Sequence, residues 1–387
     1  MGAPTATPPT VLARPRTRAV AGSFLLQGAG YAVVVTSLPS FQTRLAVDTA
    51  TVSLVLLGVC VTAGLGSAVA DLLAIRGNSR QAVTVGFMTQ AVSLIVVLSS
   101  TSPMAFVAGA LIYGIGLGII DAASNMQAVL VQRGAVAPLL GRFYAAYTAG
   151  AILGAVAMSA ALAADIGAVA ALAAVSALQF VFVILAVRRL DPARAAHARR
   201  QPRAQRLPLP GRAIVMTGLV VLAAFAIDSA VSSWSTVHLS TLGATAGLAP
   251  LGYAAYQACV LGARLAADVL VDRLGTPIVM AAAILAGALG GLVVAFLSGP
   301  VAAITGFALS GLAVGALVPI AFTKAGLIEP SRSDEVIARV NLFNYAGAVF
   351  GAVGVGLMMD VPGASLAFLL PVVLLIAALP ALSAARR

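Results

Sequence analysis

The strongest constraint on the fold is an internal repeat, because two stretches 197 residues apart align without a gap. The segment GRFYAAYTAGAILGA, residues 141–155, aligns with ARVNLFNYAGAVFGA, residues 338–352. Several isolated residues recur at the same offset, and chance hardly gives so many ungapped matches. The further pairs are Asp71 with Asp268, Arg76 with Arg273, Gly114 with Gly311 and Gly118 with Gly315. The chain is therefore a tandem duplication.

The two copies are separated by a polar segment, residues 188–212, that holds eight arginines and four prolines. A segment of this composition cannot lie in hydrocarbon, and its prolines disfavour a packed core, so it is interpreted as a solvated basic linker. We expect an N-terminal unit over 1–187, the linker over 188–212 and a C-terminal unit over 213–387.

The composition excludes a water-soluble globule. The chain is 61% hydrophobic and 9% charged, with a mean hydropathy of +1.05, which leaves too little polar surface to coat 387 residues. A helix needs about 20 apolar residues to cross a bilayer, and each copy has six such runs. We predict an all-α membrane protein with twelve transmembrane helices in two parallel-repeat bundles. The runs are 19–41, 50–73, 82–100, 104–131, 143–164, 167–187, 213–237, 248–271, 277–297, 301–323, 337–359 and 363–384.

The distribution of positive charge predicts the orientation. In a soluble protein a net charge of +11 would suggest nucleic acid, but here the basic residues lie in loops that alternate with the apolar runs. One side of the membrane receives 21 of the 23 Lys and Arg, and only Arg44 and Arg264 fall elsewhere. By the positive-inside rule both termini are cytoplasmic, which predicts a multi-pass protein of the inner (plasma) membrane that binds no nucleic acid.

Several kinds of chemistry are disfavoured. Cys60 and Cys259 lie inside apolar runs, which suggests neither a disulfide nor a metal site. With His197 and His238 as the two histidines, no imidazole cluster can form. The sequence has no GxxxxGK[ST] phosphate loop and no HExxH motif. We expect no enzyme, no cofactor and no metal.

Two six-helix repeats in parallel orientation, joined by a long linker, resemble the major facilitator superfamily. The DRLG element, residues 272–275, is similar to the superfamily's cytoplasmic DRxG signature, which Arg76 partly keeps in the first copy. The elements LPSFQTRL (38–45) and DAASN (121–125) resemble the fucose:proton symporter branch. The sequence departs from that branch at Val35, where the branch carries an acid. Valine cannot carry a proton, so one of the two acids of the branch's coupling scheme is missing at this position.

Acids inside apolar spans mark ion pathways by default, because burying a charge in a bilayer is costly. Asp121 lies near the middle of its span, on one helical face with Gly114, Gly118 and Asn125. Asp228 lies midway along the seventh span, before a hydroxyl-rich tract that contains Trp234. The resemblance implies that Asp121, and after it Asp228, are proton-coupling carboxylates. The alternative is that either acid is a neutral strut between helices.

The resemblance also implies roles for other polar residues. Candidate substrate-binding residues lie in spans that line the superfamily's cavity, and each could instead be a packing hydrogen bond. They are Gln27, Tyr31, Asn125, Tyr144, Tyr147, Ser233, Trp234, Tyr253, Gln257, Asn341 and Asn344. Candidate gating residues lie near the cytoplasmic ends of spans, where the repeat suggests pairing of Asp71 with Arg339 and of Asp268 with Arg142. They are Asp71, Arg142, Arg264, Asp268, Asp272, Arg273 and Arg339.

The sequence thus predicts a monomeric secondary active transporter whose partners are protons, a small-molecule substrate and the lipid bilayer. Proton-coupled uptake of a small polar, sugar-like solute is favoured, because AGAILGA at 149–155 lacks the GP element usual in drug:proton antiporters. Proton-coupled export of a drug or natural product stays open as the alternative.

The orientation can be tested with single cysteines introduced into a chain whose Cys60 and Cys259 have been replaced. Because Gly243 and Ser298 lie in predicted outer loops, cysteines there should react with an impermeant thiol reagent in intact cells. A cysteine at Gln201, in the linker, should not react until the cells are opened. The reverse labelling pattern would refute the orientation.

Overall fold

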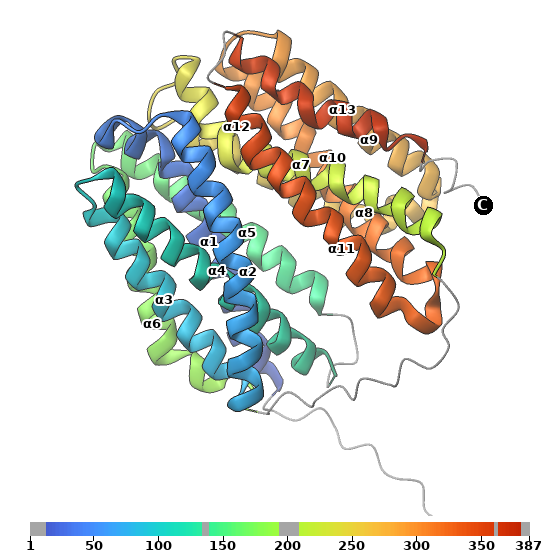
Figure 1. Ribbon diagram of the computed structural model, residues 1–387, viewed down its shortest axis with the longest axis horizontal. Helices are drawn as coiled ribbons and strands as arrows, with labels where there is room; N and C mark the ends of the chain where they lie inside the picture. Colours follow the sequence, from blue (N-terminus) through green and yellow to red (C-terminus); the bar gives the residue numbers. More distant parts are fainter. Residues whose placement is uncertain (1–12, 134–138, 193–208, 360–362, 381–387) are drawn as a thin grey trace, which may run out of the picture. The chain divides into compact units, whose positions relative to one another are not determined.

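The computed structural model describes residues 13–133, 139–192, 209–359 and 363–380, and every regular element in these ranges is helical (Figure 1). The α-helices are α1 (Ala13–Leu45), α2 (Thr49–Arg76), α3 (Ser79–Ser99), α4 (Pro103–Arg133), α5 (Leu140–Ala163), α6 (Ala168–Leu185), α7 (Gly211–Thr241), α8 (Ala249–Leu274), α9 (Thr276–Phe296), α10 (Pro300–Ile328), α11 (Ser333–Val349), α12 (Val355–Met358) and α13 (Leu369–Ala377). Four shorter elements are η1 (Val187–Arg189), η2 (Pro330–Arg332), the π-helix η3 (Phe350–Gly354) and η4 (Ala364–Phe368).

The predicted all-α membrane fold is confirmed. Within the described ranges, eleven helices are long and apolar enough to cross a bilayer. The eleventh is composite, because the π-helix η3 joins α11 to α12 in one run over Glu335–Met358. The predicted twelfth span, 363–384, corresponds to a shorter apolar helix over Ala364–Ala377. Residues 381–384 of the predicted span lie outside the described ranges.

The described chain forms two compact units. Of the described residues, unit 1 comprises 13–31, 58–133, 139–151 and 169–192, and unit 2 comprises 32–57, 152–168, 209–359 and 363–380. In unit 1, α3 packs along α4. In unit 2, α10 packs against α7, α8 and α9, and α11 packs along α7 (Figure 1). The division at a linker over 188–212 stays a prediction, and most of that linker lies outside the described residues.

Glycines set the closest helix contacts inside each unit. A Cβ at Gly150 of α5 would overlap the carbonyl oxygen of Leu25 in α1, so the two backbones touch at this point. A Cβ at Gly118 of α4 would likewise overlap the carbonyl oxygen of Ala63 in α2. Lipid gives packed helices no hydrophobic advantage, and close backbone approach at small residues supplies the dispersion contact in its place.

The same contacts recur in unit 2 at the offset of the sequence repeat. Gly347 of α11 approaches the carbonyl of Leu222 in α7, and Gly315 of α10 approaches the carbonyl of Val260 in α8. Each of these four residues stands 197 positions after its counterpart in unit 1. The duplication therefore conserves backbone contacts as well as sequence.

A buried amide fixes the end of the sixth span. Gln127 of α4 is fully buried, and its Nε2 donates to Ser79 Oγ and to the Asp191 carbonyl, both at 2.8 Å. The Asp191 backbone N–H donates back to Gln127 Oε1 at 2.9 Å, and Arg16 pairs with the Asp191 carboxylate at 2.8 Å. This network, which the sequence did not indicate, ties the chain after η1 to α1, α3 and α4.

The start of α2 has a side-chain cap. The backbone N–H of Thr51 donates to Asp48 Oδ1 at 2.8 Å, which satisfies one of the free N–H groups of the first turn. Hydrogen bonds from the Thr51 side chain and backbone hold the pKa of Asp48 below its usual range. The carboxylate thus helps α2 begin at the end of the short 46–48 connection.

The glycine contacts predict a position-specific effect of one methyl group. Gly118→Ala and Gly315→Ala should each destabilise the protein by about 1–3 kcal/mol, because the helices must move apart. Gly64 of α2 and Gly262 of α8 have open space around a Cβ, so alanine there should be neutral or stabilising by about 0.5–1 kcal/mol. Thermal unfolding of the purified protein in detergent measures both pairs. Equal midpoints for contact and control variants would contradict the packing.

Candidate functional site

The first candidate site in unit 1 is the carboxyl group of Asp121. Gln27 of α1, whose side chain is 3% exposed, donates from Nε2 to Asp121 Oδ1 at 3.1 Å. Asp121 itself is exposed although it lies in the interior of a membrane span. A carboxyl group facing lipid at this depth would be very costly, so the Asp121 carboxyl group is expected to face protein or water.

The amide of Gln27 is only half used. Its Nε2 serves Asp121, but its buried Oε1 has no hydrogen-bond partner in the described part of the chain. Buried polar atoms normally have partners, and a native exception calls for an explanation. This acceptor makes the neighbourhood of Asp121 a candidate functional site.

Asn125 lies one turn after Asp121 and links α4 to α5. Its Nδ2 donates to the Asp121 backbone carbonyl at 2.8 Å, while its Oδ1 accepts from the Tyr144 hydroxyl at 2.8 Å. The Tyr144 ring is 42% exposed and packs edge-on against Phe24. Three predicted residues, Gln27, Asn125 and Tyr144, thus come together around Asp121.

The second candidate site, in unit 2, is centred on Asp228 of α7. The Tyr256 hydroxyl of α8 donates to Asp228 Oδ1 at 2.6 Å. The Tyr253 and Tyr256 rings stack with centroids 6.3 Å apart, and Gln257 Nε2 donates to the Tyr253 hydroxyl at 2.7 Å. The structure thus joins the predicted residues Asp228, Tyr253 and Gln257 through Tyr256.

Arg264 belongs to the same group of residues. Its positive charge acts on Asp228 of α7 and on Tyr256, which lies two turns before Arg264 on α8. The sequence groups Arg264 with Asp268 at the cytoplasmic end of its span. Because α7 and α8 are packed side by side, its charge also acts on the interior acid of α7, and its gating role stays a prediction.

Trp234 is placed differently from a solute-stacking residue. Its ring is fully buried, its indole N–H donates to the Ala352 carbonyl in η3 at 2.8 Å, and Gly356 makes room for it. Ser233 is also buried, at 3% exposure. Trp234 packs α7 against the composite eleventh span, where the π-helix turns a carbonyl toward it.

The remaining predicted binding residues have ordinary placements. Asn344 Nδ2 donates to Asn341 Oδ1 at 3.3 Å along α11, and both side chains are half-buried. Tyr31 of α1 and Tyr147 of α5 are half-buried in unit 1. These four residues lie on partly exposed helix faces, and their role stays a prediction.

The predicted gating residues lie at helix ends. Asp71, Arg142, Asp268, Asp272 and Arg273 are exposed. Arg339 pairs with Glu335 one turn earlier on α11, at 2.9 Å, and Arg332 holds the same carboxylate at 2.7 Å. Arg339 therefore has a local acidic partner that the sequence did not single out, and its pairing with Asp71 stays a prediction.

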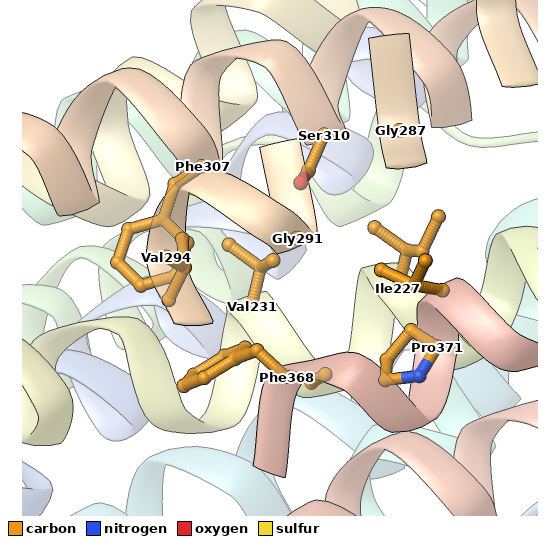
Figure 2. A pocket seen from close by; sticks show the side chains of 11 residues that line it. Ile227, Val231, Gly287, Gly291, Val294, Phe307, Ser310, Phe368 and Pro371 are labelled. Atoms are coloured by element: carbon orange, nitrogen blue, oxygen red, sulfur yellow. The ribbon is translucent and has the colours of Figure 1, made fainter. Parts of the chain in front are cut away.

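An apolar cavity in unit 2 is too small to be the site. Figure 2 shows Phe307, Phe368, Val294 and Val231 enclosing it, with Ser310 at its edge. Its volume is about 10 Å³, the size of a single water molecule. It is a packing defect between α7, α9, α10 and α13.

Unit 1 also contains a buried pair of glutamine amides that was not predicted from the sequence. Gln179 of α6 donates from Nε2 to Gln90 Oε1 of α3 at 2.7 Å, and Gly30 of α1 leaves space beside them. Both side chains are fully buried in the middle of apolar spans. Their mid-span position was the signal that could have found them.

Comparison with known proteins identifies the family. A family model described as Major Facilitator Superfamily matches residues 20–327, most of the chain. The chain belongs to the major facilitator superfamily. Members of this superfamily are transporters, so the expectation of a transporter is confirmed at the level of the family.

Relatives cover nearly the whole chain. An uncharacterized MFS-type transporter of Yersinia pestis is 26% identical over 348 residues, 89% of each chain. Membrane protein MosC of Rhizobium meliloti is 22% identical over 91% of this chain and 85% of its own.

Solved structures share the fold. A point mutant of the nucleoside transporter NupG aligns with a TM-score of 0.74 at 14% identity, over 97% of this chain and 99% of its own. FucP in its outward conformation aligns with a TM-score of 0.65 at 16% identity, over 96% and 98%. The likeness to NupG and FucP shows the fold alone.

The contact between Tyr256 and Asp228 predicts a stability effect. Tyr256→Phe leaves the buried side of Asp228 without its donor, and should destabilise this superfamily member by about 1.5–3 kcal/mol. Tyr345→Phe is the matched control, since Tyr345 is 61% exposed on α11. Thermal unfolding in detergent compares the two, and equal midpoints would show that the Tyr256 bond carries no net energy.

Proposed function

We propose that this protein is a proton-coupled symporter that takes up a small polar, sugar-like solute by alternating access. The proposal rests on one observation, the half-used amide of Gln27 beside Asp121. Symport requires a carboxyl group that is stable both with and without its proton. The surroundings of Asp121 supply a partner for each state.

In the ionised state, Asp121 accepts the hydrogen bond from Gln27 Nε2 that is present in the structure. In the protonated state, the carboxyl group gains an O–H donor. Gln27 Oε1, buried and without a partner in the described part of the chain, is an acceptor on the same amide. A single glutamine can therefore serve both states, whereas an arginine partner would serve only the ionised one.

Asp228 is the second candidate by the same criterion. It accepts from the Tyr256 hydroxyl and lies under the influence of the Arg264 charge, and both interactions stabilise a carboxylate. Its partners are a hydrogen-bond donor and a positive charge, which oppose the cost of burying a carboxylate in the span. Asp228 is thus assigned to binding or to coupling through Arg264, and Asp121 to carrying the proton.

The polar groups near the two acids indicate the kind of solute. Tyrosine and asparagine side chains offer stacking faces together with neutral donors and acceptors. Such groups suit a hydroxylated ring. We assign this binding role to Asn125 and Tyr144 in unit 1, whereas the buried Tyr253 and Gln257 of unit 2 support Asp228 from within α8.

The proposed setting is the bacterial inner membrane, with both termini in the cytoplasm and the chain acting as a monomer. The charge distribution supports this orientation, since the spans leave 21 of 23 basic residues on one side.

The test is transport in proteoliposomes, with a solute selected by thermal shift from sugars, nucleosides and drug-like compounds. An imposed inward proton gradient should drive accumulation by the unmodified protein. Asp121→Asn cannot carry a proton, so accumulation should fall to the level of protein-free liposomes, while solute counterflow continues. Gln27→Leu should lower the accumulated level and make it more dependent on pH.

Gln42→Leu, on the same helix α1 and half-buried, is the control for loss of an amide. Accumulation that survives in Asp121→Asn but is lost in Asp228→Asn would move the proton to α7. Accumulation driven by an outward proton gradient would instead show proton:solute antiport, the mechanism of the alternative reading as an exporter.

A further inference from the structure

The last turn of α7 carries a histidine that the proposed mechanism does not use. His238 is 1% exposed, and neither its Nδ1 nor its Nε2 has a hydrogen-bond partner among the described residues. A neutral imidazole has one N–H donor and one acceptor, so both of its polar groups are left unsatisfied. Buried polar atoms without partners are rare and costly, which distinguishes His238 from an ordinary core residue.

The imidazole is one of three rings that contact one another. Phe307 of α10 lies edge-on to it with the ring centroids 6.2 Å apart, and Phe368 of η4 is tilted against it at 5.1 Å. The two phenyl rings contact each other at 5.5 Å, and both also line the small apolar cavity of Figure 2. We name His238, Phe307 and Phe368 the ring cluster. It joins α7 to α10 and to the segment that precedes α13.

The elements around the ring cluster bring no charge to it. α9, η4 and α13 have no acidic or basic side chain along their described lengths, and Lys324 lies near the other end of α10. On α8, two tyrosine hydroxyls are engaged with Gln257 and Asp228, and the charged residues begin at Arg264, in the second half of the helix. Burial is accordingly the one influence on the protonation of His238 within the described chain.

A proton on this imidazole would be poorly tolerated inside the ring cluster. Two compensations exist, because aromatic faces attract a cation and the last turn of a helix favours positive charge. Both are weak beside the hydration that an ion loses when it is buried without an opposite charge or a hydrogen-bond acceptor. Protonation therefore favours a state in which the imidazole reaches water.

We propose that His238 is a pH-sensitive latch. As a neutral imidazole it completes the ring cluster and holds η4 and α10 against the end of α7. Once protonated, it leaves the cluster for water, and the contact between α7 and η4 loosens. The latch is separate from Asp121, and the inference does not depend on the proposed coupling or direction of transport.

The direction of the pH effect follows from which state binds the proton. An imidazole in water takes up a proton below about pH 6.5, whereas the closed ring cluster excludes it. The stability of the closed cluster is therefore fully present above about pH 6.5 and is lost as the pH falls further. In the predicted orientation this end of α7 faces outward, so the latch responds to acidity outside the cell.

The chain contains a natural probe of the latch. Trp234 is the one tryptophan of the sequence and lies one turn before His238 on the same face of α7. Its ring is fully buried, and its indole N–H donates to the Ala352 carbonyl. Opening of the latch should therefore expose Trp234 to solvent, and its emission can be followed without interference from another tryptophan.

The test is tryptophan fluorescence of the purified full-length protein in detergent, from about pH 8 to about pH 5, with acrylamide as a neutral quencher. As the solution becomes acidic, the emission of Trp234 should shift to the red and its quenching by acrylamide should increase. Binding of one proton raises the ratio of open to closed protein by up to about tenfold for each pH unit below about 6.5.

Substitutions at His238 separate the latch from other titrating groups. His238→Phe and His238→Leu place a side chain that cannot bind a proton in the ring cluster, so Trp234 should stay shielded over the whole pH range. Leucine tests the same point if phenylalanine is too large for the site. His197→Gln removes the other histidine of the chain and should leave the titration unchanged.

Three results would overturn the latch. One is that acrylamide quenching of Trp234 in the unmodified protein does not change with pH. Another is that the same change occurs in the His238 variants, which would assign it to a different acid or base. The third is a loss of intensity without a red shift or easier quenching, which would mean that His238 is protonated inside the closed cluster. A change that is kept in His197→Gln and lost in the His238 variants supports the proposal.

Discussion

The structure depends on close backbone contact between helices at glycine. In a bilayer, lipid tails are as apolar as leucine, so helices gain stability from tight dispersion contact more than from burial. Gly150 against Leu25 and Gly118 against Ala63 provide this contact in unit 1, and their repeat partners provide it in unit 2. The polar side chains on these helices are consequently held within hydrogen-bonding distance of one another.

The contact positions also place the interior acid of unit 1. Gly118 stands one turn before Asp121, so the contact of α4 with α2 fixes the rotation of α4 about its axis. Gly28, one residue after Gln27, meets the Tyr147 carbonyl of α5, which fixes α1 in the same way. The hydrogen bond between Gln27 and Asp121 is thus a consequence of backbone packing.

Interior polar groups of this protein differ in how many of their hydrogen bonds are made within the described chain. Gln127 uses both its donor and its acceptor on neighbouring backbone and side chains, and it behaves as a strut. Gln27 and Thr236 each keep one buried polar atom without a partner in the described residues. In a low dielectric an unpaired polar atom is costly, and for Gln27 we propose that the proton of the protonated Asp121 carboxyl group supplies the missing partner.

The membrane fold, the duplication and the interior acids could all be predicted from the sequence. Each can be seen in the order of the residues alone, as hydropathy, as a fixed offset between similar segments, or as a charge inside an apolar run. Gln27, Asn125 and Tyr144 were also predictable, as polar residues on apolar spans. Which of these residues form hydrogen bonds with one another could be learned only from the folded chain. The contacts of α1 with α4 and α5 depend on the rotation of each helix about its axis, and the close glycine–carbonyl contacts set that rotation. For the same reason packing buried Trp234 against Ala352 and brought the Tyr256 hydroxyl to Asp228. Packing brings together residues that are far apart in the chain, and no local sequence pattern encodes which of them become neighbours.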